Sequence, residues 1–330
     1  MPWGIYPEEP PAPGHVVQLA RVLFGTSADF DVQLLPEGLR NFNYRVQFDS
    51  GREPLVLRIY GHDRDAWRKE VALLETVRKA GIPVPEVVAV QEGGATSVPA
   101  FSGRPFIVIR YVEGITFREL KNRHNPRATG EAAYSIGETV AAFSTTAVYE
   151  RCTNECPPAL SPVLETPNAL LAMLDDCFRS PILAARLDTI TRQRLYELAW
   201  GHSEELNSIA RERRLVHGDF GNRNVLVHLK EGRWQVAAVI DWEFACSGPP
   251  LIDIGSFIRY ETPGRPIREP HFSRGYLAGG GTLPNGWWRL ARIIDLITQC
   301  RTLTREWLPE SVVKEVAELV QRTADQEYVA

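Results

Sequence analysis

The stretch that decides the fold is Leu215–Glu243, which reads LVHGDFGNRNVLVHLKEGRWQVAAVIDWE. It contains two apolar runs, and the sequence Lys-Glu-Gly at residues 230–232 between them is typical of a turn, so it predicts a β-hairpin. A hairpin brings its two ends side by side. We therefore expect Asp219 and Asn224, which precede the first strand, to lie next to Asp241 at the end of the second.

These three side chains indicate metal and phosphate chemistry. Two carboxylates and an amide oxygen are hard ligands of the kind that suits Mg²⁺ carrying phosphate. A carboxylate that is not bound to the metal can accept or orient the proton of a substrate hydroxyl. The alternative is a polar hairpin loop with satisfied side chains, and the presence of both halves of the pattern in order argues against it.

The tripeptide HGD, an Asn five residues after its Asp, and then a strand and IDWE resemble the aminoglycoside phosphotransferase and choline kinase superfamily. Its members are small-molecule kinases with a protein-kinase-like fold. The matching parts of protein kinases are the catalytic-loop Asp and Asn and the metal-binding Asp. The resemblance implies that Asp219 is the catalytic residue and that Asn224 and Asp241 bind Mg²⁺.

The resemblance also implies residues that support this site. His217 resembles a residue whose ring fixes the catalytic loop, with proton shuttling as the alternative. Asp253, within GPPLIDIG, resembles a buried Asp that braces the same loop. Glu243 is expected to face the cleft without being a third tight metal ligand.

The segment before the hairpin has the order of elements expected for a nucleotide-binding lobe. Three alternating strands and an amphipathic helix are predicted over residues 31–35, 41–48, 54–60 and 65–80. The run GLRNFNYRV resembles the nucleotide-covering loop of the choline and homoserine kinase branches. Asn41 and Asn43 are therefore candidate nucleotide-binding residues, and an ordinary hairpin turn is the alternative.

Arg58 stands where a kinase places its phosphate-binding Lys, and this is the clearest departure from the family pattern. Arg can still bind phosphate, with a bidentate fork instead of a point charge. The alternative is a solvated cation on an edge strand. Glu70 lies in the first half of the predicted helix, where a kinase offers a carboxylate to this cation; a surface Glu beside Arg68 and Lys69 is the alternative.

The passage between the lobes is predicted at Phe106–Ile109, a buried-type strand that continues into Arg110 and Val112. In the kinase interpretation this is the hinge. Backbone groups around Arg110 and Val112 would then read the adenine edge, and Ile109 would line the adenine pocket. A plain strand-to-loop exit is the alternative.

The chain after the hinge is predicted to be mainly helical, over residues 131–149, 168–187 (broken at Pro181), 191–211, 287–303 and 311–325. The Pro-rich segment 151–167 is predicted to be a connecting loop. Residues 243–330 hold eleven acidic and ten basic residues, which disfavours a polycationic aminoglycoside substrate. Trp287, Trp288 and Trp307 are interpreted as core residues, with a cation-binding cage as the alternative.

The composition is typical of a globular cytoplasmic protein. The chain has 330 residues, 44% of them hydrophobic, and a net charge of −4. It is long enough for two lobes, and it indicates neither a broad basic surface for nucleic acid nor a membrane span. Residues 1–14 are predicted to be loosely ordered and lack the features of a signal peptide. The five cysteines are interpreted as reduced thiols.

Together these features predict an α+β, bilobal protein-kinase-like fold. Residues 1–109 would form a small lobe with an antiparallel sheet and one helix, and residues 110–330 a larger, mostly helical lobe. ATP or GTP would bind between them with Mg²⁺, and the γ-phosphoryl group would pass to a hydroxyl of a small molecule.

The acceptor class stays open: an antibiotic such as an aminoglycoside, or a choline-like, amino-acid-like or sugar alcohol. A pseudokinase that binds nucleotide as a regulatory module is one alternative function. A protein kinase is another, disfavoured because no Ala-Pro-Glu activation segment follows Asp241. The sequence does not indicate an oligomeric state.

Overall fold

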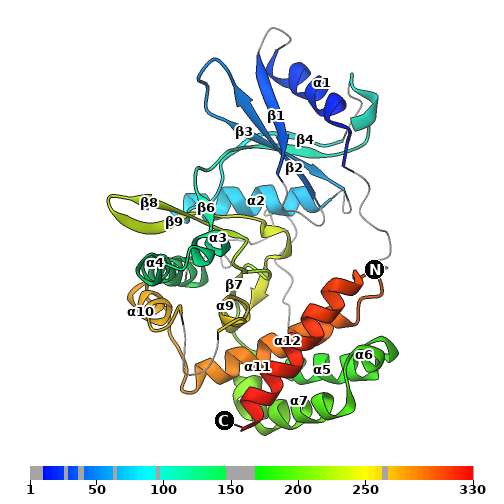
Figure 1. Ribbon diagram of the computed structural model, residues 1–330, viewed down its shortest axis with the longest axis vertical. Helices are drawn as coiled ribbons and strands as arrows, with labels where there is room; N and C mark the ends of the chain where they lie inside the picture. Colours follow the sequence, from blue (N-terminus) through cyan, green and yellow to red (C-terminus); the bar gives the residue numbers. More distant parts are fainter. Residues whose placement is uncertain are drawn as a thin grey trace.

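The computed structural model describes residues 10–25, 29–35, 41–61, 65–93, 97–145, 168–261 and 267–329. Figure 1 shows two lobes. The upper lobe is a sheet with helices packed on it, and the lower lobe is mainly helical. The strands are β1 (Phe30–Leu34), β2 (Asn41–Phe48), β3 (Leu55–Tyr60), β4 (Val87–Gln91), β5 (Phe106–Arg110), β6 (Ile115–Thr116), β7 (Arg214–Val216), β8 (Val225–Lys230), β9 (Arg233–Val239) and β10 (Cys246–Gly248). The helices are α1 (Pro13–Phe24), α2 (Ala66–Lys79), α3 (Phe117–Asn122), α4 (Pro126–Thr145), α5 (Ala169–Arg179), α6 (Pro181–Arg186), α7 (Thr189–Gly201), α8 (Ser203–Ile209), α9 (Leu251–Ile258), α10 (His271–Ala278), α11 (Trp287–Leu303) and α12 (Glu310–Val329).

The small lobe is built on an antiparallel sheet with the strand order β1-β2-β3-β5-β4. Side chains alternate between its two faces, as the pleat requires. In β3, Leu57 and Ile59 pack with Leu19 of α1, whereas Tyr60 packs with Trp67 of α2. This alternation places Arg58 on the α2 face, because it is two residues from Tyr60.

Several predicted boundaries differ from the observed ones. The helix α1 begins at Pro13, inside the segment predicted to be loosely ordered, because Pro fits the first helical turn, where its missing N–H needs no partner. The helix predicted over 191–211 is two helices, α7 and α8, separated at His202. The short helices α3, α9 and α10 were not predicted as separate elements. Residues 1–9, 36–40 and the whole 151–167 loop lie outside the described residues.

The predicted hairpin is present as β8 and β9, which pair from Val225 opposite Val239 to Lys230 opposite Arg233. Its two-residue turn has φ of 51° at Glu231 and 77° at Gly232, the positive values that a tight hairpin turn favours. At the open end, the Ile240 N–H donates to the Asn224 carbonyl at 2.9 Å. The two ends of the decisive stretch therefore meet, as expected.

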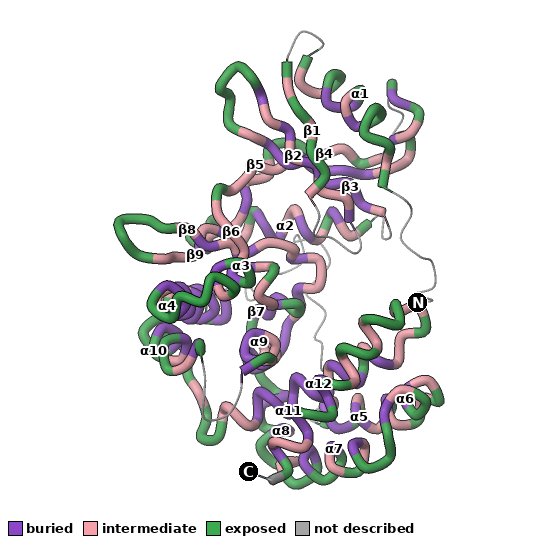
Figure 2. Tube along the Cα trace, in the orientation of Figure 1, coloured by how far each residue is buried: buried purple, intermediate pink, exposed green. Residues whose placement is uncertain are grey.

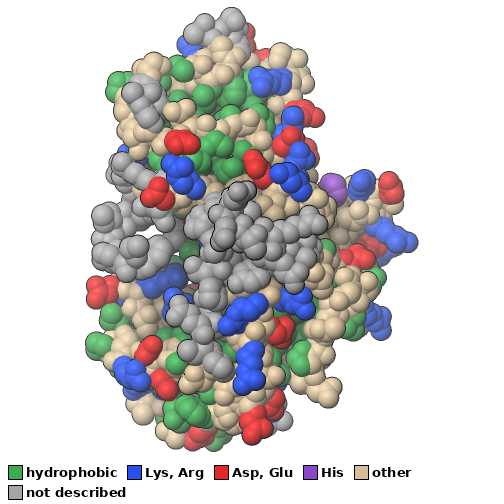
Figure 3. Space-filling view, turned by 180° about the vertical axis from the view of Figure 1, so that it is seen from behind, with side chains coloured by type: hydrophobic (Ala, Val, Ile, Leu, Met, Phe, Trp, Pro, Cys, Tyr) green, Lys and Arg blue, Asp and Glu red, His purple; other side chains and the backbone are tan. Residues whose placement is uncertain are grey.

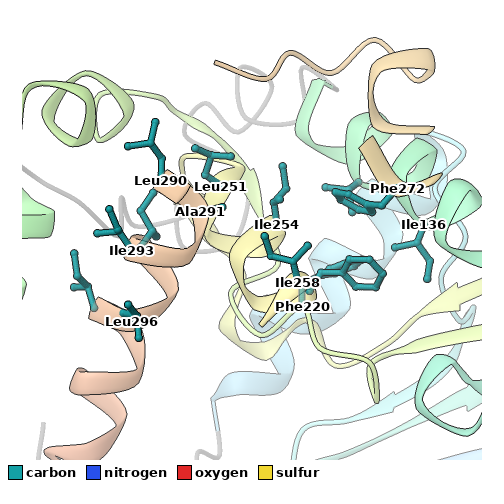
Figure 4. Packing of buried hydrophobic residues seen from close by; sticks show 14 of the residues in the cluster. Ile136, Phe220, Leu251, Ile254, Ile258, Phe272, Leu290, Ala291, Ile293 and Leu296 are labelled. Atoms are coloured by element: carbon teal, nitrogen blue, oxygen red, sulfur yellow. The ribbon is translucent and has the colours of Figure 1, made fainter. Parts of the chain in front are cut away.

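The helix α9 lies at the centre of the large lobe. Figure 2 shows buried residues along α4, α9 and α11. In Figure 4, Ile258 of α9 lies beside Phe220 of the loop before β8, and Leu251 lies beside Leu290 and Ala291 of α11. The helix thus joins this loop to the C-terminal helices.

Charged side chains of both signs lie on the surface. On the face seen in Figure 3, acidic and basic side chains are interspersed over both lobes. Among the described helices, none combines the length and apolarity that a bilayer crossing requires.

Candidate active site

The loop between β7 and β8 is fixed by the ring of His217, which is fully buried. Its Nε2 lies 2.9 Å from the Ile240 carbonyl, and its Nδ1 lies 3.3 Å from the backbone N of Asp219. These partners require a neutral ring with the proton on Nε2, since Nδ1 must accept. Burial lowers the pKa of His217 to about 4, which keeps the ring neutral near pH 7. These contacts support the structural role over proton shuttling.

Asp253 of α9 holds the same loop through hydrogen bonds to the loop backbone. Its carboxylate accepts hydrogen bonds from the backbone N–H groups of His217 at 2.6 Å and Gly218 at 3.0 Å. Only 1% of the residue is exposed, and burial raises its pKa to about 7. The loop is therefore held on both sides, by its own histidine and by α9.

Gly218 occupies a position that no other residue fits without strain. Its φ is +81°, and a Cβ there would lie 2.4 Å from the Phe244 carbonyl oxygen. Gly218→Ala should lower the free energy of unfolding by about 1–3 kcal/mol through the left-handed backbone and the clash. Urea denaturation measures this loss.

The neighbouring Gly221 supplies a matched control for that substitution. A Cβ at Gly221 meets no atom within 4 Å, and its φ lies outside the left-handed region. Gly221→Ala should leave the denaturation midpoint near that of the wild type. Equal stability of the two variants would contradict the strained role assigned to Gly218.

Asp219 and Asn224 are brought together as predicted. The amide Nδ2 of Asn224 donates to the Asp219 carbonyl at 2.8 Å and to its Oδ2 at 3.1 Å. Asp219 is exposed to solvent, yet the protein around it displaces enough water to raise its pKa to about 6. Asp241 adds to this increase, whereas Arg259 and Arg305 act against it.

This pKa predicts a pH dependence for any reaction in which Asp219 accepts a proton. A carboxylate with a raised pKa is protonated as the pH falls through that value, so kcat/KM should fall below a pH of about 6. An acid limb near the ordinary pKa of aspartate would show that Asp219 is not the titrating base. The measurement is a pH profile of kcat/KM with a constant, saturating nucleotide concentration.

Asp241 lies opposite, at the end of β9, with φ of 68° and ψ of 58°. This left-handed conformation is uncommon for a non-glycine residue and is found at functional sites. Arg58 Nη2 donates to its Oδ1 at 2.5 Å. Within the described residues, neither Asp241 Oδ2 nor Asn224 Oδ1 accepts a hydrogen bond. This pair of hard oxygens fits Mg²⁺, which prefers one or two protein ligands together with phosphates and water.

Arg58 and Glu70 form the predicted pair. Arg58 Nε lies 3.1 Å from Glu70 Oε2, and Tyr60 donates to the same oxygen at 2.6 Å. Arg58 is 6% exposed and Glu70 2%, and β3 is an inner strand of the sheet. The alternatives of a solvated cation on an edge strand and of a surface glutamate are therefore both wrong.

The two asparagines of β2 have different surroundings. Asn41 Nδ2 donates to Glu243 Oε2 at 3.1 Å, which ties the sheet to the segment that follows Asp241. Asn43 pairs directly opposite Arg58 in the β2–β3 register, so its side chain shares the Arg58 face. Glu243 thus faces the small lobe.

The predicted hinge residues do not lie together: Ile109 is on the Arg58 face of the sheet, whereas Arg110 and Val112 line a separate hollow. Ile109 packs against the cluster of Tyr60 and its neighbours on the Arg58 face of the sheet. The Arg110 N–H donates to the Glu86 carbonyl at 2.9 Å and is therefore not available to adenine. Arg110 and Val112 line a hollow of about 540 Å³ whose lining includes no residue of the catalytic loop.

Four charged residues around the loop were not predicted: Arg259, Glu261, Arg268 and Arg305. Arg268 Nη2 donates to Asn222 Oδ1 at 3.3 Å, and Arg268 also pairs with Glu261 in the interior. The charges of Arg259 and Arg305 lower the pKa of Asp219. No local sequence pattern indicates these residues, because they are distant from the loop in the sequence and only tertiary packing brings them near it.

The fold is matched by solved structures of other proteins. The GDP complex of an aminoglycoside 2'-phosphotransferase-IIIa has a TM-score of 0.72 and 19% identity, over 94% of this chain and 98% of that one. A spectinomycin phosphotransferase in complex with ADP and spectinomycin has a TM-score of 0.59 and 13% identity, over 95% and 98% of the two chains. These similarities confirm the predicted bilobal, protein-kinase-like fold.

The sequence comparisons assign the family. Human acyl-CoA dehydrogenase family member 11 is 32% identical over 90 residues, which are 27% of this chain and 10% of that protein. The chain thus spans only a small part of that relative. Residues 31–292 match the phosphotransferase enzyme family, APH. Because this match includes both the sheet and the catalytic hairpin, the chain belongs to the phosphotransferase enzyme family.

Proposed function

We propose that the protein transfers the γ-phosphoryl group of ATP or GTP to a hydroxyl of a small molecule. Residues 1–109 would bind the nucleotide, and residues 110–330 would supply the catalytic hairpin and the acceptor site. The observation that carries this proposal is the convergence of Asp219, Asn224 and Asp241 at one end of the hairpin, facing Arg58 of the sheet. This is the set of groups that phosphoryl transfer requires.

Each residue then has a definite task. Arg58, oriented by Glu70, would bind nucleotide phosphate through the guanidinium group that pairs with Asp241 in this structure. Asn224 and Asp241 would hold Mg²⁺, which when bound would neutralise charge on the phosphates. Asp219 would orient the acceptor hydroxyl and take its proton.

The remaining predicted residues would complete the nucleotide site. Asn43 shares the face of Arg58, and Asn41 holds the segment after Asp241 close to the sheet. Ile109 would contact the base, with backbone groups near Val112 as its polar partners. GDP and ADP in the similar solved structures support a purine nucleotide here and leave both ATP and GTP as candidates.

A nucleotide-binding pseudokinase is the second candidate, and the bond from Arg58 to the metal-binding Asp241 is the observation in its favour. Against it, the proton acceptor and both predicted metal ligands are present together. The test is nucleotide consumption with Mg²⁺ against a panel of aminoglycosides, choline-like and amino-acid-like alcohols, and sugars. Consumption that depends on one acceptor class supports the enzyme, whereas nucleotide binding without turnover on any acceptor supports the pseudokinase.

A further inference from the structure

A buried ion pair lies beside the catalytic loop and is not among the groups that phosphoryl transfer itself requires. Its members, Arg268 and Glu261, are 1% and 4% exposed. Both oxygens of the carboxylate are engaged. Oε1 accepts from the Arg268 guanidinium, and Oε2 accepts the backbone N–H groups of Ile267 at 2.5 Å and of Arg268 at 3.3 Å. Glu261 is therefore a fixed anchor for the guanidinium.

The guanidinium of Arg268 also packs against two aromatic rings. Its central carbon lies 5.8 Å from the ring centroid of Phe117 on α3 and 5.2 Å from that of Phe257 on α9. From this position its Nη2 donates to Asn222 Oδ1 at 3.3 Å. Arginine has only donors, so the amide of Asn222 must present its oxygen here. The arginine thus joins the interior of the large lobe to the catalytic loop.

Asn222 lies between the two parts of the loop to which chemistry is assigned. The Gly221 N–H donates to the Asp219 carbonyl at 2.8 Å, and the Asn224 N–H donates to the Gly221 carbonyl at 3.0 Å. The Asn222 carbonyl accepts the N–H of Arg118 on α3 at 3.0 Å. Asn222 is therefore held by α3 through its backbone and by the buried ion pair through its side chain.

Stability alone does not account for a buried arginine at this position. Moving two charges out of water costs free energy that their attraction often only balances, and hydrophobic residues of similar volume are often as stable. Burial lowers the pKa of Arg268, with the Glu261 carboxylate opposing this, and its buried Nε has no hydrogen-bond partner among the described residues. Arginine nevertheless suits a role toward the loop, because its planar fork can bond an interior carboxylate and a loop amide at once.

We propose that Arg268 is a positioning residue for phosphoryl transfer, which holds Asn222 so that Asp219 and Asn224 keep their mutual geometry. Glu261 in turn orients Arg268. The inference rests on the proposed phosphotransferase function, and it assigns the ion pair no contact with nucleotide or acceptor. A misplaced catalytic group slows the chemical step more than it weakens ground-state binding. Loss of the contact should therefore lower kcat and leave KM for nucleotide nearly unchanged.

The first test changes the amide and leaves the buried pair intact. Asn222→Asp keeps an oxygen that accepts from Arg268, whereas Asn222→Leu has a similar size and no acceptor. Rates are measured with Mg²⁺ and the acceptor of the panel above that supports the fastest consumption of nucleotide, on the plateau above the acid limb of Asp219. We expect Asn222→Leu to lower kcat about tenfold to 10²-fold, with KM for nucleotide within about twofold of wild type. Asn222→Asp should keep kcat near the wild-type value.

The second test asks whether Arg268 acts through Asn222. Arg268→Gln is combined with Glu261→Gln, so that neither charge stays buried without its partner. This double variant should lower kcat by a factor similar to that of Asn222→Leu. Adding it to Asn222→Leu should lower kcat by less than about twofold more, because residues in contact are not additive. The control is Arg289→Gln, which breaks a pair with Glu327 elsewhere in the large lobe and should leave kcat unchanged in both backgrounds.

The outcomes separate this inference from the function on which it rests. Transfer by the wild type, together with an undiminished kcat in Asn222→Leu, overturns the positioning role and leaves the phosphotransferase intact. Full multiplication of the two effects in the combined variant also overturns it. If the double variant does not fold, as judged by urea denaturation, equal kcat in Asn222→Leu and Asn222→Asp overturns the inference, and a loss confined to Asn222→Leu supports it. Absence of acceptor-dependent transfer by the wild type overturns the proposed function and the inference together.

Discussion

Asp219→Asn should reduce kcat for phosphoryl transfer by about 10²–10⁴-fold, the range attributed to a positioned general base. The amide keeps the shape of the side chain but does not take a proton from the acceptor hydroxyl. Nucleotide affinity should change little, because Arg58, Asn224 and Asp241 remain. Stability should also be kept, since the Asp219 side chain is exposed to solvent.

The control for this variant is Asp176→Asn, which removes a carboxylate that is 73% exposed on α5. Both proteins would be compared by initial rates and by nucleotide titration. If Asp219→Asn retained the activity of the Asp176→Asn control, Asp219 would not be the proton acceptor. If it lost nucleotide binding as well, its role would lie in the nucleotide site.

Arg58→Met should cost about 3–5 kcal/mol of stability, because it leaves the buried Glu70 and the partly buried Asp241 without their cation. Nucleotide affinity should fall with it, because the phosphate-binding fork is gone. Burial is the main cause that raises the pKa of Glu70, and Arg58 opposes it. Loss of Arg58 therefore raises that pKa further.

The sign of the pH effect follows from this shift. A group whose pKa is higher in the folded than in the unfolded protein binds more protons when folded, so stability decreases as the pH rises through the folded value. Arg58→Met should therefore be more destabilised relative to wild type in alkaline than in acid solution. Urea denaturation across that range measures the difference.

A second substitution separates stability from nucleotide binding. Arg58→Met combined with Glu70→Gln removes the unpaired carboxylate and should recover part of the lost stability, but not the affinity for nucleotide. Recovery of both would show that Arg58 serves only the fold. An Arg58→Met protein as stable as wild type would contradict the buried pair on which the account depends.

The hairpin and its acidic ends could be predicted because their signals are local. Apolar alternation sets the strands, a Glu-Gly turn joins them, and closure of the hairpin brings Asn224 to Asp241 without any long-range information. The pairing of Arg58 with Glu70 followed from the order of the elements. The burial of this pair also depends on β5, which pairs with β3 and so makes β3 an inner strand of the sheet.

The contacts of the large lobe with the catalytic loop could not be predicted in the same way. Arg268 and Asn222 are 46 residues apart in numbering, so only tertiary packing brings them within hydrogen-bonding distance. The helix α3 was detectable, since Thr116 and Glu119 form a capping box whose T-x-x-E spacing is visible in the sequence. The bond from the Arg110 N–H to Glu86 could not be predicted, because it depends on the irregular pairing of β4 with β5.

The most direct test of the central claim follows the γ-phosphoryl group itself. The protein is incubated with γ-labelled ATP or GTP, Mg²⁺ and the panel of small alcohols, with Asp219→Asn in parallel, and the label is traced to its product. The account predicts labelled small-molecule phosphate with the wild type and little or none with the variant. Label that stays on bound nucleotide, or that passes to a protein such as casein instead, would contradict it.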